Sequence, residues 1–152
     1  MSFSAEEEVQ YRQWCCGDET AVDMLRIIGE ASRIADDFVD GDTQSPDDMA
    51  ALLHLLLVAL PSNQFYRQHQ MWLLPVMVAG LQQWNASNDW AVSSDENVQM
   101  FGYVYREAME QIISVVAMLC GGDAHGRQVA KEVNDFYHQR HGETFKEWVQ
   151  NG

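Results

Sequence analysis

The sequence is poor in positive charge and has no long apolar run. Its 152 residues include 9 Lys+Arg against 23 Asp+Glu, for a net charge of -14. Because nonspecific binding to duplex nucleic acid needs a basic face, this balance excludes a simple duplex-binding module. No apolar run reaches the ~18 uninterrupted residues of a membrane span. The acidic N-terminus does not fit a signal peptide, so we expect no membrane association.

Cysteine is also scarce. Cys15, Cys16 and Cys120 lack the spacing of a zinc site, and they leave one thiol over if any pair forms. Such a set is typical of a reducing compartment, so the sequence predicts a cytoplasmic protein. At this length a chain buries enough of its surface to form a core without disulfides or a structural metal.

Apolar residues recur every three or four positions along most of the chain, and no stretch alternates as a half-buried strand does. Ser4 and Ser45 are typical residues before a helix start, and Gly41 is typical after a helix end. The sequence therefore predicts an all-α, single-domain helical bundle of six or seven helices over residues 1–152. The expected helices are about 4–16, 18–41, 45–61, 62–84, 94–121 and 124–140, with a short amphipathic tail after residue 142.

The fourth expected helix is apolar nearly all round from Met71 to Leu81, which places it at the centre of the predicted bundle. Pro75 predicts a kink in it, and residues 85–94 are expected to form a loop. An exposed continuation of this helix would favour a homodimer. His54, in an apolar run of the third helix, is expected to be buried or half-buried.

Three aspartates gather at the end of the second expected helix, as Asp36-Asp37-Phe38-Val39-Asp40. At ~100° per residue, Asp36 and Asp40 lie one turn apart on nearly the same face. Two stacked carboxylates can hold Mg²⁺ while the ion keeps waters and takes oxygens from a phosphate. These like charges crowd the negative end of the helix dipole, and such local conflicts are expected most at functional sites.

This DDxxD segment resembles the first aspartate-rich motif of isoprenoid diphosphate and terpene synthases, where the motif chelates the metal ions that grip a diphosphate. The resemblance covers residues 35–40 and implies three Mg²⁺ ligands: Asp36, Asp37 and Asp40. The alternative is a solvated helix face. Asp36 and Asp40 fall roughly 140–180° from the apolar stripe, and Arg33 can pair with Asp37 one turn on.

A second acidic pattern joins ExxE on the fifth expected helix to ExxD on the sixth. Its order and spacing resemble the all-α nucleotide pyrophosphohydrolases, small helical proteins that bind Mg²⁺ between paired helices and cleave nucleoside triphosphates. The resemblance implies four further Mg²⁺ ligands: Glu107, Glu110, Glu132 and Asp135. Arg106 and Lys131, each beside one of these glutamates, are the expected phosphate-binding residues, with ordinary surface ion pairs as the alternative.

Two functions of different classes follow. The first is a Mg²⁺-dependent enzyme acting on a small molecule that contains a diphosphate or triphosphate, in which the metal neutralises substrate charge and activates water. The second is a noncatalytic acidic helical interaction protein whose negative face binds a basic partner. The enzyme requires that Asp36 and Asp40 look into a cleft shared with a neighbouring element or subunit, whereas the interaction protein requires only that they face solvent.

Overall fold

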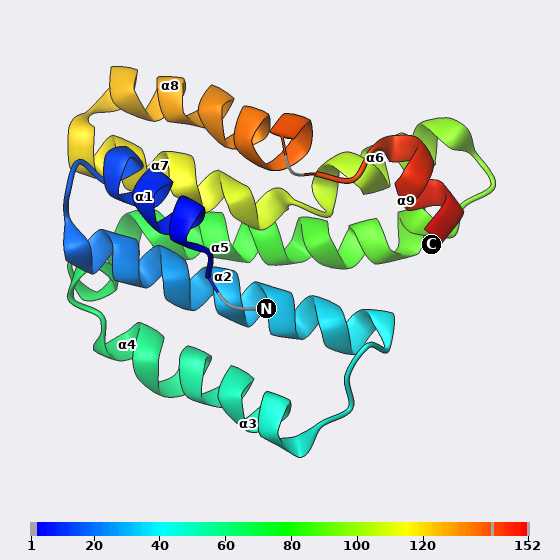
Figure 1. Cartoon of the computed structure of the whole chain (residues 1–152), viewed down its shortest axis with the longest axis horizontal. Coiled ribbons are helices and arrows are strands. Elements are labelled where there is room, and N and C mark those ends of the chain that lie inside the picture. Colours follow the sequence, from blue (N-terminus) through cyan, green and yellow to red (C-terminus); the bar gives the residue numbers. More distant parts are fainter. Residues whose placement is uncertain (1–2, 141, 152) are drawn as a thin grey trace. The chain divides into compact units, whose positions relative to one another are not determined.

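A computed structural model of the chain describes residues 3–140 and 142–151 (Figure 1). All regular structure in these two ranges is helical, which confirms the all-α prediction. The contacts gather in two compact units, Met1–Gln70 and Met71–Gly152. One helix runs through the boundary between the units, and the single-domain organisation stays a prediction.

No single helix of the described residues is long and apolar enough to cross a membrane. The helical segments on either side of Asn63, Pro46–Ser62 and Gln64–Ala91, meet that test of length and composition only when they are taken together.

The first unit begins with helices whose ends follow local signals. Ser4 and Glu7 form a capping box at the start of α1, and Asp18 caps α2 through the backbone N–H groups of the next turn. Gly41 ends α2 at φ 78°, a left-handed conformation that glycine adopts without strain. The elements are α1 (Ala5–Trp14), α2 (Glu19–Asp40), α3 (Pro46–His54), the π-helical η1 (Leu55–Ala59) and α4 (Leu60–Ser62).

The core of the first unit forms around α2. This helix contacts α1, α3, η1 and α4, and its apolar face, which includes Met24 and Leu25, is buried. By contrast, no residue of α3 or η1 is buried. The expectation of a buried or half-buried His54 is therefore wrong: its side chain is exposed, because only one side of this helix meets α2.

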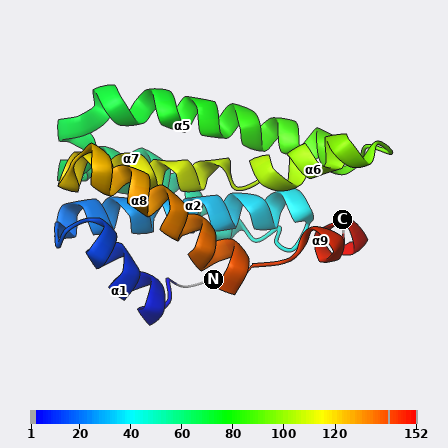
Figure 2. The same cartoon turned by 90° about the horizontal axis from the view of Figure 1, so that it is seen from above.

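The second unit contains the rest of the chain. Its elements are the main part of α5 (Gln64–Ala91), α6 (Glu96–Tyr105), the 3-10 turn η2 (Ala108–Glu110), α7 (Gln111–Gly121), α8 (Asp123–Asn134), the π-helical η3 (Asp135–Arg140) and α9 (Phe145–Asn151). Helices α7 and α8 form its most extensive contact, and α5 lies along α6 and α7 (Figures 1 and 2).

Two boundaries differ from the expected ones. Most of the expected loop 85–94 is helical, because α5 continues to Ala91. Buried Ser87 donates a hydrogen bond to the Trp84 carbonyl, and Trp90 packs against α6, so tertiary contacts outweigh the weak helix propensity of this polar stretch. The expected long helix 94–121 is broken at Glu107, whose φ of -102° and ψ of 22° separate α6 from α7.

The apolar segment of α5 is buried along one side only. Leu73 and Gly80 are buried, and a Cβ on Gly80 would lie 2.7 Å from the Met109 sulfur. The opposite side is exposed. The expected kink at Pro75 is also displaced: the residue with non-helical dihedral angles is His69, at φ -119° and ψ 19°. Pro75 itself lies on the exposed side.

Candidate functional site

Six carboxylates flank the turn between α2 and α3, and we call this group the acidic turn. Its members are Asp36, Asp37, Asp40, Asp42, Asp47 and Asp48. Four of them are exposed and two are half-buried. Because residues 34–66 include no lysine or arginine, this part of the chain supplies no cation to offset the six negative charges.

The acidic turn is held by its own hydrogen bonds. The Asp42 N–H donates to the Asp37 carbonyl at 2.8 Å, which closes the end of α2. The Thr43 hydroxyl donates to the Asp48 carboxylate, and the Ser45 hydroxyl accepts the N–H of Asp48 at 3.4 Å. These contacts order the backbone of the turn and explain why helix-start and helix-stop signals predicted its position.

The acidic turn does not provide the set of ligands expected for a metal centre. Among residues 3–140 and 142–151, no three or more His, Cys, Asp or Glu side chains are grouped so that they could hold a metal ion. Asp36 and Asp40 are exposed, and residues 34–66 include no arginine or lysine that could bind a phosphate. Mg²⁺ binding by Asp36, Asp37 and Asp40 therefore stays a prediction.

Arg33 does not pair with Asp37 as expected. Its guanidinium pairs instead with the carboxylate of Glu7 on α1. Glu7 is only 6% exposed and also accepts the Ser4 N–H at 2.9 Å. Since a buried carboxylate needs a counter-charge more than a solvated one does, Arg33 joins α1 to α2 rather than compensating the acidic turn.

The second acidic pattern is brought together only in part. Glu107 and Glu110 line a pocket of about 190 Å³ within the second unit. The facing α8 and η3 contribute Asn134 and His138, whereas Glu132 and Asp135 are not among the lining residues. The other lining residues are Val104, Gln111, Ser114, Ala130 and Val133. On this side of the pocket the helix presents positions 130, 133, 134 and 138. Mg²⁺ binding by Glu107, Glu110, Glu132 and Asp135 stays a prediction.

His138 is the residue at this pocket that the sequence did not single out. Its Nε2 lies 3.0 Å from Glu110 Oε2, on an adjacent element of the fold. The hydrogen bond to Glu110 raises the pKa of His138 above its ordinary value of 6.5, and the negative charges of Glu110 and Glu107 act in the same direction. Burial and Arg106 oppose this shift.

This ion pair predicts a pH dependence of stability. A raised pKa in the folded state means that the stabilising contribution is fully present below pH 6.5 and is lost as the pH rises through the folded-state pKa. We expect the free energy of unfolding to fall more steeply above pH 6.5 in the natural protein than in His138→Gln. Urea unfolding across a pH series measures this, and parallel profiles for the two proteins would contradict it.

Arg106 and Lys131, the expected phosphate-binding residues, lie in different settings. Arg106 pairs with Glu143 at 3.3 Å and with Glu107 at 3.7 Å, and its guanidinium lies 4.7 Å from the centre of the Tyr103 ring. These contacts bind the C-terminal segment to α6, and the charge of Arg106 is already paired with two carboxylates. Lys131 is exposed on α8. Phosphate binding by either residue stays a prediction.

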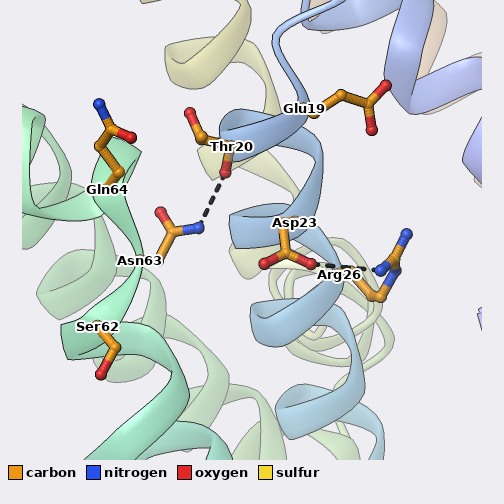
Figure 3. A pocket seen from close by; sticks show the side chains of 7 residues that line it. All are labelled: Glu19, Thr20, Asp23, Arg26, Ser62, Asn63 and Gln64. Carbon is orange, nitrogen blue, oxygen red and sulfur yellow. Dashed lines mark hydrogen bonds and ion pairs between the residues drawn. The ribbon is translucent and has the colours of Figure 1, made fainter.

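A second pocket, in the first unit, was not predicted. It has a volume of about 380 Å³ and lies where α2 meets the break between α4 and α5 (Figure 3). Its lining residues are Glu19, Thr20, Asp23, Arg26, Ser62, Asn63 and Gln64. The buried Asn63 fixes its geometry by donating to the Thr20 carbonyl at 3.0 Å and accepting the Tyr66 N–H at 2.9 Å. The sequence signal was Asn63 itself, a residue typical of helix starts.

The charged groups of this second pocket pair with arginines. Arg26 bonds Asp23 at 3.3 Å, as Figure 3 shows, and Arg12 bonds Glu19 at 2.8 Å. The hydrogen bond from Arg12 lowers the pKa of Glu19. Because these carboxylates already have cationic partners, the pocket is a polar recess whose charges are compensated.

The fold and these sites define an acidic, all-α protein whose conspicuous polar feature is an exposed group of carboxylates. Comparison with protein-family models, with curated proteins and with solved structures gives no match. The two motif-level resemblances therefore stay predictions, and the function must be argued from the charge and geometry of this chain.

Proposed function

We propose that this protein is a noncatalytic helical interaction protein and that its acidic turn binds a basic partner. The observation that carries the proposal is the acidic turn itself. Its six carboxylates lie at the end of α2 and the start of α3, and residues 34–66 around them include no lysine or arginine. Clustered like charges raise the local negative potential, which attracts a cationic surface and speeds its association.

The exposure of the acidic turn supports binding to a surface rather than to a small molecule. Neither the 380 Å³ pocket nor the 190 Å³ pocket includes one of its residues. Small-molecule sites are usually concave and mostly apolar, whereas charged rims chiefly determine how fast and how specifically proteins meet.

Binding to a defined cationic probe tests the proposal. We expect the full chain to bind a fluorescent oligolysine peptide at about 50 mM salt and to lose this binding at several times that ionic strength, because the Debye length shortens. Replacing Asp36, Asp40 and Asp47 together by asparagine should weaken binding about tenfold, or roughly 1.4 kcal/mol.

A matched variant controls for net charge. This variant also removes three negative charges, but from exposed positions outside the acidic turn: Glu6→Gln, Asp89→Asn and Glu96→Gln. We expect its affinity for the peptide to fall less than threefold. Equal losses in the two triple variants would mean that total charge alone attracts the peptide, which contradicts a role for the acidic turn.

Thermal melting separates this function from the Mg²⁺-dependent enzyme. We expect millimolar Mg²⁺ to shift the melting temperature by less than about 1 °C, because a ligand stabilises only a state that binds it. A stabilisation that Asp36→Asn and Asp40→Asn abolish would overturn the proposal and favour the enzyme.

A further inference from the structure

The break between α6 and α7 has no cause in the local sequence. Residues 103–120 include no proline and no glycine, the residues at which sharp helix bends usually occur. Apolar side chains also keep a helical spacing of three or four residues across the break, at Phe101, Tyr105, Ala108, Ile112, Val115 and Leu119. The local sequence therefore favours one continuous helix, and tertiary contacts must impose the break.

The break separates two parts of this apolar face. Phe101 is 57% exposed, whereas Ala108 and Ile112 are buried. In a continuous helix, Phe101 and Ile112 would lie only about 20° apart around the axis, on the same face. The structure thus leaves outside the core a side chain that the continuous helix would place in line with it.

The backbone at the break has the geometry of a hinge. Glu107 has a φ of -102° and a ψ of 22°, and the 3-10 turn η2 follows it. The N–H of Glu110 donates to the carbonyl of Glu107, three residues back, at 3.0 Å. A continuous α-helix would use the carbonyl of Arg106, four residues back. A short 3-10 stretch between two α-helical segments is typical of a functional hinge.

Two ion pairs from the C-terminal part of the chain bridge the break. His138 Nε2 lies 3.0 Å from Glu110 Oε2, on the side of the break that leads into α7. Glu143 Oε2 lies 3.3 Å from Arg106 Nη1, on the side where α6 ends. The two sides of the break are therefore tied separately to residues that follow α8.

Trp148 of α9 adds a third contact. Its ring centre lies 5.7 Å from that of Tyr103, and a Cβ on Gly102 would lie 3.3 Å from Trp148 Cη2. Helix α9 lies against α6, as Figure 1 shows. Because α9 has only seven residues, it depends on this packing for its order. We call the three side chains that make these contacts, His138, Glu143 and Trp148, the C-terminal clamp.

The broken arrangement carries a cost at Arg106. Its Nε atom is buried, and none of the residues that the structure describes accepts a hydrogen bond from it. The carboxylate of Glu107 lies 3.7 Å away, beyond hydrogen-bond distance. A buried donor without an acceptor is unfavourable. Stabilising contacts, such as those of the C-terminal clamp, must therefore offset this cost.

We propose that residues 106–110 are a hinge that the C-terminal clamp holds in the broken form, and that release of the clamp lets residues 96–121 form one continuous helix. A segment with two arrangements, biased by contacts from another element, is the requirement for a conformational switch. The hinge would reshape the pocket of about 190 Å³, because Val104 lies before the break and Ser114 after it. The hinge is independent of the proposed function, since the acidic turn lies in the first unit.

Nuclear magnetic resonance of the full chain tests the hinge. The variant carries His138→Ala, Glu143→Ala and Trp148→Ala together. We expect the ¹³Cα chemical shift of Glu107 to move to a helical value. Amide exchange at Ala108 and Met109 should slow by at least about tenfold, because a continuous helix gives these N–H groups hydrogen bonds to carbonyls four residues back.

A matched variant truncates three side chains of α9 outside the clamp. Lys146→Ala, Val149→Ala and Gln150→Ala are all at exposed positions. We expect this variant to keep the natural chemical shift of Glu107 and the natural exchange rates. The same change in both triple variants would overturn the proposal, because the hinge would then respond to any truncation of α9.

The remaining outcomes also decide the proposal. A clamp variant that is folded by circular dichroism but keeps the natural Glu107 shift would overturn it. The break would then be assigned to the packing of Met109 on α5, where a Cβ on Gly80 would lie 2.7 Å from the Met109 sulfur. Each single clamp replacement should move the Glu107 shift part of the way. If none does, the proposal is overturned even where the triple variant does not fold.

Discussion

Replacing Arg33 with methionine is expected to lower the free energy of unfolding by about 3 kcal/mol. Methionine keeps most of the apolar volume of the side chain but removes the guanidinium that pairs with Glu7. Glu7 is 6% exposed, so water cannot take over that role. Breaking one half of a buried ion pair costs far more than the pair itself contributes, because the remaining charge stays desolvated. Urea unfolding at pH 7 measures the loss.

Arg127→Met is the matched control. Arg127 pairs with Asp123 at 3.3 Å, and both side chains are 75% exposed. We therefore expect Arg127→Met to lower the free energy of unfolding by less than about 0.5 kcal/mol. Adding Glu7→Gln to Arg33→Met removes the buried carboxylate charge while keeping an acceptor for the Ser4 N–H, and it should recover at least half of the lost free energy of unfolding. An Arg33→Met variant as stable as Arg127→Met would contradict the structural role given to the Glu7–Arg33 pair.

Helix positions were predictable because their signals are local. The capping box of Ser4 and Glu7, the Asp18 and Ser45 caps and the left-handed Gly41 act within one turn of the helix ends they define. The partner of Arg33 was not predictable in this way. The i+4 rule considers only neighbours on the same helix, whereas Glu7 lies 26 positions away and is more deeply buried than Asp37.

The ExxE segment shows a second limit of sequence periodicity. Glu107 and Glu110 do line a pocket, but a break in the helix lies beside them, and the helix opposite presents Asn134 and His138 instead of the expected acids. A shift of one residue turns a helix face by about 100°, so short acidic spacings cannot specify which side chains meet.

The apolar segment of α5 shows a third limit. An apolar pattern predicts that a helix face is buried. The pattern is the same whether that face packs against another helix of the chain or against a second molecule. The sequence placed Met71–Leu81 at the centre of a bundle, and the structure leaves one side of it exposed. The all-α class was therefore predictable, whereas the exposure of this helix required the tertiary structure.

Gly126→Ala is expected to destabilise the protein by about 2 kcal/mol, although alanine is the better helix former. Gly126 lies where α8 packs closely against α7. A Cβ at this position would lie 2.7 Å from Met118 Cβ and 3.1 Å from both Met118 Cα and the Ser114 carbonyl oxygen. Most of these atoms belong to the backbone of α7, so the helices must move apart to relieve the overlap.

Gly29→Ala supplies the opposite case on α2. No atom lies within 4 Å of a Cβ built on Gly29, so the gain in helix propensity should appear as a stabilisation of about 0.5–1 kcal/mol. Urea unfolding of both variants at one pH compares the two sites directly. If the same substitution stabilised the protein at both positions, the close approach of α7 and α8 at Gly126 would be contradicted, because propensity alone would then account for both results.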